Sequence, residues 1–236
     1  MMNKSILFCL GMIIPSILSA QSGTVDFREK ASYIDQVQLG RNMLITYNLG
    51  HTELKGTPFL FEDFRKGDVY FSNKKMVRDL MINYNCFTGE LLYNSEDITY
   101  IVNKLDIDYF TLTGDQPDEI LLFKQVFIPD EKKRDFLQIL YDEKTILFKR
   151  HLKEFKETEI KSPYHNNQEY DEYVDKKEYL VSTKDGKIVP LKPRKNSIMK
   201  TFPDQATVLE EFIKNEKINL KNETDLIRLI EYYDSL

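Results

Sequence analysis

Apolar and polar residues alternate between positions 58 and 93, and this alternation constrains the fold more than any other feature of the sequence. Val69 and Phe71 stand between more polar neighbours, and two turn-forming pairs, Asn73-Lys74 and Thr88-Gly89, separate the alternating runs. A period of two places successive side chains on opposite faces of a β-strand. The segment therefore predicts a β-meander.

Further strands are predicted after the meander. Short β-rich runs occupy residues 98–102, 109–112, 136–141 and 145–149. Residues 120–128 form a longer apolar run bounded by Pro117 and Pro129, which predicts a strand buried over much of both faces. Asp185-Gly186 lies between two more β-rich runs and predicts a hairpin with a type I′ turn.

The apolar period changes from two to 3.6 after Pro193. Ser197 can cap a short helical turn, Asp204 a helix that stops near Asn215, and Asn222 a second helix. One stripe of this second helix carries Leu226, Leu229, Ile230 and Tyr233. We expect the stripes to pack on the sheet, because no other segment can cover it; the alternative is a helix-turn-helix reader or a partner-binding hairpin.

The expected fold class is α+β, with an antiparallel sheet of hairpins that can curl or become barrel-like and a C-terminal two-helix unit. The expected organisation is a signal peptide at 1–20, an N-terminal lead with the first strand or strands at 21–57, an antiparallel β domain at 58–192 and a helical pair packed on the sheet at 193–236. Residues 151–177, inside the β domain, are polar without a period and predict a lead-out and an exposed loop.

The first 20 residues have the features of a secretory signal peptide. Lys4 precedes an apolar run over residues 6–14, and Leu18-Ser19-Ala20 supplies small residues before a cleavage site after Ala20. The run is shorter than the roughly 20 apolar residues of a membrane-spanning helix. We therefore expect a periplasmic or secreted protein whose mature chain has no membrane span.

The charge and the cysteine content argue against nucleic-acid binding and against an intramolecular disulfide. The formal net charge is −5, and a nucleic-acid partner would call for a basic face, so we expect no nucleic-acid binding. Of the 2 cysteines, Cys86 alone lies outside the signal peptide, so no intramolecular disulfide is expected. We interpret Cys86 as a small buried apolar residue of the meander.

No motif for catalysis, metal binding or a cofactor is present. His51, His151 and His165 lack partners at metal-ligand spacing, and the chain has no phosphate-binding glycine loop, so we expect no metal and no cofactor. Asp106 and Asp108 form a carboxylate pair that could serve glycoside hydrolysis. A second pair of acids, Asp115 and Asp118, flanks Pro117.

The most acidic stretch also carries three tyrosines. Tyr164, Tyr170 and Tyr173 stand among Glu169, Asp171, Glu172 and Asp175. A tyrosine offers an apolar ring with a polar tip, so these three are candidates for a partner surface. A calcium loop would need oxygens around a glycine turn, and no glycine lies between Gly114 and Gly186.

Several motifs resemble those of an uncharacterised secreted protein family of Bacteroidota. They are Gly56-Thr57-Pro58-Phe59-Leu60, Phe64-x-x-Gly67-x-Val69, Tyr84-Asn85, the passage from Lys192-Pro193 to Phe202, and the end from Leu226 to Leu236. The resemblance implies an exported protein and carries no assigned activity or functional residues.

The functional expectation is a soluble, exported envelope protein that binds a partner, such as another envelope protein, and is not an enzyme. The alternative is a hydrolase that acts on envelope glycan or peptide through a carboxylate pair such as Asp106 and Asp108. A third hypothesis is strand addition to another chain at an uncovered sheet edge, for which residues 38–48 are candidates. The sequence predicts no oligomeric state.

Overall fold

A computed structural model of the chain describes residues 54–96, 98–116, 118–157, 171–183 and 185–236. The expected signal peptide and the candidate edge at 38–48 lie outside these residues. So do His51, His165, Tyr164 and Tyr170.

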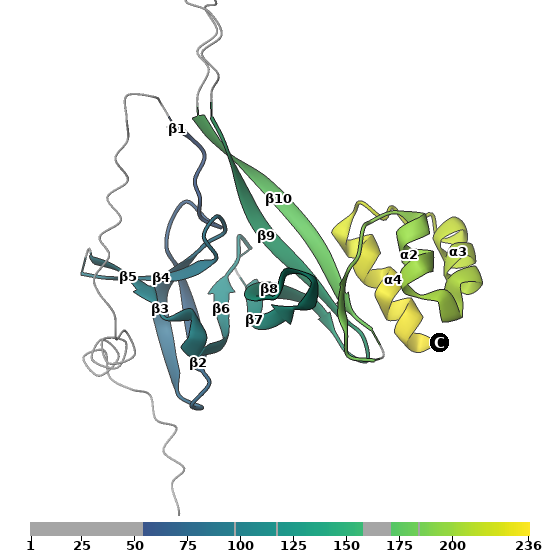
Figure 1. Cartoon of the computed structure of the whole chain (residues 1–236), viewed down its shortest axis with the longest axis horizontal. Helices are drawn as coiled ribbons and strands as arrows, with labels where there is room; N and C mark the ends of the chain where they lie inside the picture. Colours follow the sequence, from purple (N-terminus) through teal and green to yellow (C-terminus); the bar gives the residue numbers. More distant parts are fainter. Residues whose placement is uncertain (1–53, 97, 117, 158–170, 184) are drawn as a thin grey trace, which may run out of the picture.

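One sheet and a group of C-terminal helices make up the described chain (Figure 1). The strands are β1 (Leu54–Lys55), β2 (Arg65–Phe71), β3 (Met76–Asn85), β4 (Glu90–Ser95), β5 (Ile98–Val102), β6 (Ile107–Thr113), β7 (Ile120–Ile128), β8 (Lys133–Asp142), β9 (Ile146–Lys156), β10 (Asp171–Ser182) and β11 (Ile188–Pro190). The helices are α2 (Lys195–Thr201), α3 (Ala206–Asn215) and α4 (Glu223–Ser235), with 3-10 helices η1 (Lys104–Asp106), η2 (Pro129–Glu131) and η3 (Pro203–Gln205).

The strands follow the order β1-β10-β9-β8-β7-β6-β2-β3-β4-β5, with β11 paired to β10. Every pairing is antiparallel except that of β1 with β10. The predicted α+β class with an antiparallel sheet is therefore confirmed. The barrel-like form is wrong, because β1 and β5 end the sheet and no pairing among the described residues joins them.

The open sheet curls strongly. β2, β6 and β7 separate β3 from β8 in the sheet, yet Tyr84 on β3 donates a hydrogen bond to Asp135 on β8 at 3.1 Å. Register shifts at Gly67 in β2 and at Ile139 in β8 are the irregularities that bend a strand and raise its twist. The inside of the curl holds a core of aromatic and aliphatic side chains: Val69, Phe71, Leu80, Ile82, Tyr84, Leu91, Ile107, Phe110, Leu112, Phe123 and Phe136 are among them.

β7 covers the predicted residues but is not buried on both faces. Phe123 and Ile128 are buried, whereas Ile120 and Phe127 are 62% and 51% exposed. One face of an antiparallel meander packs on the core while the other faces solvent. The long apolar run was therefore misleading about burial.

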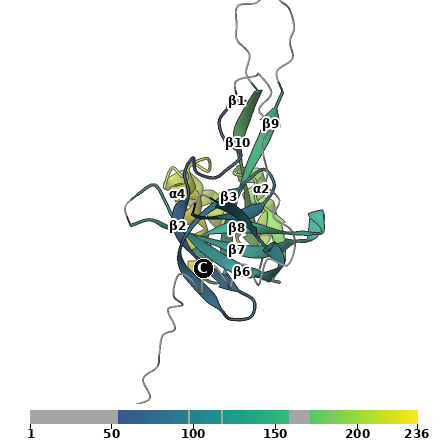
Figure 2. The ribbon, with the colours of Figure 1, turned by 90° about the vertical axis from the view of Figure 1, so that its left-hand side faces the viewer.

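The described parts of the polar segment, 151–156 and 171–177, are strand, which corrects the loop prediction for 171–177; residues 158–170 lie outside the described chain. β9 continues to Lys156 and β10 begins at Asp171, and the two pair along their length. Opposite charges face each other across the pair: Lys153 lies 2.6 Å from Asp175 and Lys176 lies 2.6 Å from Glu154. Cross-strand ion pairs and ladder hydrogen bonds stabilise this hairpin in place of an apolar period. Figure 2 shows β9 and β10 rising away from the other strands.

The hairpin between β10 and β11 turns at Gly186, as predicted, but not in the predicted turn type. Gly186 has a φ of 74° and its amide donates to the carbonyl of Thr183 at 2.8 Å. Asp185 is not in the left-handed region, whereas a type I′ turn needs positive φ at both central residues.

Three α-helices follow the sheet, so the prediction of a two-helix unit is wrong. The segment expected to form a short turn is α2, in which Ser197 lies inside the helix instead of capping it. α3 ends at Asn215 as predicted, but its N-cap is Gln205 because Asp204 lies in η3. The Asn222 cap of α4 is confirmed, since its side chain accepts from the amide of Asp225 at 3.0 Å.

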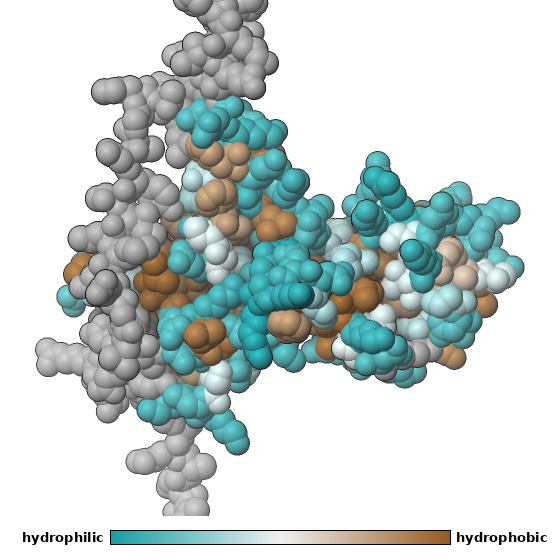
Figure 3. Space-filling view, in the orientation of Figure 1, coloured by the Kyte–Doolittle hydropathy of each residue, from teal (hydrophilic) through white to brown (hydrophobic). Residues whose placement is uncertain are grey.

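The helices pack against the β8–β10 end of the sheet. Their shared cluster contains Leu147, Tyr179, Val181, Leu191, Ile198, Phe202, Leu209, Leu226, Leu229, Ile230 and Tyr233. Asp234 on α4 also accepts a hydrogen bond from the amide of Thr145 at 2.8 Å. Apolar surface is visible where the sheet meets the helices (Figure 3). Within the described chain, no helix combines the length and hydropathy needed to cross a membrane.

Candidate functional site

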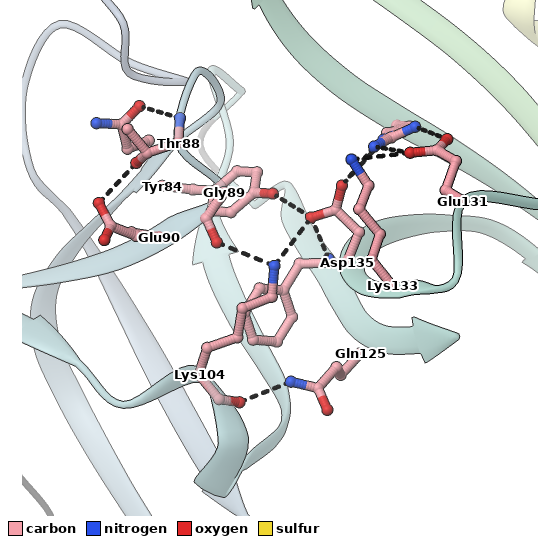
Figure 4. A network of polar contacts seen from close by, with 12 residues as sticks. Tyr84, Thr88, Gly89, Glu90, Lys104, Gln125, Glu131, Lys133 and Asp135 are labelled. Atoms are coloured by element: carbon pink, nitrogen blue, oxygen red, sulfur yellow. Dashed lines mark hydrogen bonds and ion pairs between the residues drawn. The ribbon is translucent and has the colours of Figure 1, made fainter. Parts of the chain in front are cut away.

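Asp135 on β8 is the centre of a buried polar network (Figure 4). Its Oδ1 accepts hydrogen bonds from the Tyr84 hydroxyl at 3.1 Å and from Lys104 Nζ at 3.2 Å. Its Oδ2 accepts from Arg150 Nε at 3.0 Å. The carboxylate, which is 6% exposed, is thus fully paired.

Arg150 on β9 connects this network to the surface. Its two terminal nitrogens donate to Glu131 in a bidentate arrangement, at 2.6 Å and 3.1 Å, and Nη1 also donates to Glu178 at 3.3 Å. Lys104, on the link between β5 and β6, donates to the Gly89 carbonyl at 3.2 Å as well. The network therefore links β3 and the β5–β6 connection to β8 and β9 across the inside of the curled sheet.

The electrostatics of the network do not suit proton transfer near neutral pH. Hydrogen bonds from Arg150 and Lys133 lower the pKa of Glu131 to about 2. Burial and the adjacent Asp135 raise the pKa of Tyr84 well above its ordinary value. A general acid or base needs a pKa near the working pH. We interpret the network as a structural connection between strands.

Cys86, His151 and Asp175 line one small pocket of about 340 Å³, and they are the residue types of a thiol hydrolase. Burial raises the pKa of Cys86 to about 12, so the thiol stays protonated at neutral pH. His151 Nε2 is committed to Gln138 Oε1 at 2.6 Å. No hydrogen bond links Cys86 to His151 within the described structure, so this trio lacks the geometry of an activated nucleophile.

His151 makes the stability of the fold depend on pH. Burial lowers its pKa from 6.5 to about 4, so the unfolded chain takes up a proton before the folded chain does. The contribution of neutral His151 to the free energy of unfolding is fully present above pH 6.5 and is lost as the pH falls toward 4. After a discount for partial exposure of the ring, we expect a loss of about 1–2 kcal/mol. Urea unfolding between pH 4 and 7 measures this loss in the unmodified protein and in His151→Gln, whose free energy of unfolding should fall less steeply with falling pH. Equal slopes of unfolding free energy against pH would contradict the prediction.

The carboxylate pair of the hydrolase hypothesis, Asp106 and Asp108, lines neither the pocket at Cys86 nor the larger pocket at the β10–β11 junction. Asp106 is in η1, where it accepts from Asn103 Nδ2 at 2.8 Å, and Asp108 is exposed on β6, where it accepts from Ser72 Oγ at 2.8 Å. The second pair comprises the exposed Asp115 and Asp118. Their surroundings explain these acids as surface residues.

Tyr173 is the one described member of the predicted tyrosine surface. It contacts Phe87 and Phe155 with ring centroids 5.5 Å and 5.1 Å away, near the end of the β9–β10 ladder where β9 stops and β10 begins. Asp171, Glu172 and Asp175 lie on β10 and not in a cation-binding loop. No group of three potential ligands is positioned for a metal ion in the residues that the structure describes.

A larger pocket lies where β10, β11 and the start of α2 meet, and we call it the junction pocket. Its volume is about 610 Å³. Its lining comprises Ile128, Asp130, Glu131, Lys177, Glu178, Tyr179, Leu180, Pro190, Leu191, Lys192, Pro193, Arg194 and Lys221. Volumes of about 300–1,000 Å³ with mainly apolar walls are typical of small-molecule sites.

The sequence contains no signal for the junction pocket, because its walls come from segments far apart in the chain. Ile128 ends β7, Leu180 lies on β10, and Lys221 precedes α4. Among the residues that line it, none is a histidine, cysteine, serine or threonine. The arrangement therefore suits binding better than nucleophilic chemistry. No protein-family model, curated protein or solved structure matches the chain.

Proposed function

We propose that this chain is a non-enzymatic binding protein, exported to the cell envelope, whose ligand occupies the junction pocket. The observation that carries the proposal is the pocket itself, about 610 Å³ in volume, with Ile128, Leu180 and Leu191 in its walls and seven charged residues among those that line it. The signal features of residues 1–20 and the resemblance to a secreted family support export.

The walls of the pocket are well supported by the fold. Ile128 and Leu180 belong to one apolar cluster, and Tyr179 and Leu191 belong to the cluster under the helices. The amide of Leu191 also donates to the carbonyl of Tyr179 at 2.8 Å. A site built on packed strands needs little reorganisation to bind, and this preorganisation favours affinity.

Acid–base catalysis in the junction pocket has less support than ligand binding. Of the acids at the pocket, Glu131 and Glu178 are both hydrogen-bonded to Arg150. The low pKa of Glu131, about 2, leaves it unprotonated at neutral pH and a weak base. The pocket thus combines a volume for a ligand with no group tuned for proton transfer.

The test is the recovery of a bound compound. Protein produced with its leader in its own host, purified from the envelope fraction and denatured, should release one small molecule in near-stoichiometric amount by mass spectrometry. Pro190→Trp should carry much less, because Pro190 is exposed at the pocket and an indole there occupies ligand volume. The matched control is Glu231→Ala on the exposed face of α4.

Other outcomes of that purification would contradict the proposal. Turnover of an envelope glycan or peptide, abolished by changing one carboxylate or His151, would establish the hydrolase instead. A stoichiometric protein without a small molecule would favour strand addition. The structure offers β5 for this second function, because Ile98–Val102 is uncharged and pairs only with β4 within the described chain.

A further inference from the structure

The geometry points to an amphipathic anion as the ligand of the junction pocket: a small molecule with an apolar body and one carboxylate or similar anionic group. This inference rests on the proposed binding function and names the chemical class of the ligand. Three observations support it: the apolar floor of the pocket, the unpaired cations at its rim, and an unpaired stretch of strand beside it.

The floor would hold the apolar body. Ile128 and Leu180 are each 3% exposed and Leu191 is 1% exposed, so these side chains are fixed by the clusters behind them. Pro190 and Pro193 extend the apolar lining toward the rim. Because the three buried side chains expose almost no surface themselves, the apolar area removed from water would come from the ligand and from Pro190 and Pro193, and this burial is favourable roughly in proportion to the area covered.

The rim carries a surplus of available positive charge. Lys177, Lys192, Arg194 and Lys221 line the pocket, and none of them forms an ion pair with any described residue. Lys177 Nζ lies 5.8 Å above the ring of Tyr179, on the wall of the pocket. This concentration of cations contrasts with the formal net charge of −5 for the chain.

The acids at the same rim do not cancel these cations. Glu131 and Glu178 both accept hydrogen bonds from Arg150, and Glu131 also pairs with Lys133 at 2.8 Å. The buried network centred on Asp135 therefore has a consequence at the pocket: its three cations, Arg150, Lys104 and Lys133, balance the charges of Asp135, Glu131 and Glu178, so the two acids at the rim repel an anion less than isolated carboxylates would. Asp130 is the remaining acid of the lining.

The strand β10 adds backbone groups at this place. β1 pairs with Asp171 and Glu172, and β11 pairs with Leu180–Ser182. Between them, residues 174–178 have β9 on one side and no strand on the other within the described structure. The Leu191 amide donates to the Tyr179 carbonyl on this edge, so by alternation the Lys177 amide lies on the same free edge, and an anionic group in the pocket could accept a hydrogen bond from it as well as from the cations.

Other ligand classes fit less well. A cation would meet four like charges and only Asp130 as a partner that is not already bound to Arg150. A polyanion would leave the apolar floor unused. A membrane surface is less suitable because the site is a hollow of about 610 Å³, the volume of a site for a single small molecule.

Decanoate, decanol and decylamine provide a matched probe series, because they share one chain and differ in the charge of the head group. Titration calorimetry on the full mature protein, at low ionic strength and below micelle formation, should show decanoate binding at least tenfold tighter than decanol and decylamine weakest. A tenfold difference in affinity corresponds to about 1.4 kcal/mol, which a single hydrogen-bonded charge contact can supply. The preference should shrink as salt is added.

Variants that remove charges at the rim test whether the rim cations cause the preference for decanoate over decanol. Lys192→Gln together with Arg194→Gln should weaken decanoate about tenfold and leave decanol unchanged, because both side chains are exposed and outside the core. Lys200→Gln together with Lys214→Gln removes two exposed cations that do not line the pocket, and it should change neither ligand.

Each contrary result separates this inference from the proposed function. Equal affinities for decanoate and decanol would overturn the anionic class and leave the binding function standing. Recovery from the native purification of a pocket-bound compound without an anionic group would do the same. Attachment only to vesicles of anionic phospholipid would replace the free ligand with a membrane. Failure of all probes together with an empty pocket after native purification would overturn both.

Discussion

Asp135→Asn should lower the free energy of unfolding by about 3–5 kcal/mol. The carboxylate is 6% exposed and pairs with Arg150, itself 4% exposed, and with Lys104. The amide has nearly the same size but no charge, so it leaves both cations without their buried counter-ion. We expect the lower end of the range, because Arg150 keeps its bidentate contact with Glu131.

Urea unfolding at pH 7, followed by circular dichroism, measures this loss. The control is Glu210→Gln, which removes the exposed pair between Lys195 and Glu210 and should change the unfolding free energy by less than about 1 kcal/mol. If Asp135→Asn were as mild as the control, the network would not be the connection between β3 and β8 that we infer.

Leu229→Ala should cost about 2–5 kcal/mol, the range for truncating a fully buried leucine. Leu229 is 0% exposed in the cluster that α4 shares with β9 and β10. The sheet should lose stability together with the helices, because Leu147, Tyr179 and Val181 belong to the same cluster. The expected result is one cooperative transition at lower urea concentration.

Far-ultraviolet circular dichroism reports the helices, and tyrosine signals report the sheet as well. Coincident curves are expected from both probes. Glu231→Ala, which changes an exposed position two residues away on α4, should stay within about 0.5 kcal/mol of the unmodified protein. Early loss of helical signal with an unchanged sheet transition would show that the helices and the sheet unfold separately.

Several parts of the fold could be predicted because their causes are local. Alternation of side chains identified β2, β3 and β4, and the left-handed Gly89 marks the predicted turn between β3 and β4. The Asn222 cap was readable because a side-chain acceptor three residues before a free amide is sufficient to start a helix. Such features depend on a few neighbouring residues.

Errors arose where distant residues decided the outcome. Residues 151–156 and 171–177 have no apolar period, yet they are strand because each half of the hairpin supplies hydrogen bonds and opposite charges to the other. Burial of β7 could not be read from its apolar run, because only the packed sheet decides which face is covered.

The sequence by itself determined the local elements: most strands, the turns at glycine and the helix that begins after Asn222. The tertiary structure alone decided the curl that brings Tyr84 to Asp135, and the meeting of β10, β11 and α2 that creates the junction pocket. The reason is that strand periods and caps act over a few residues. Contacts across a curled sheet instead depend on how all its strands pair and twist together.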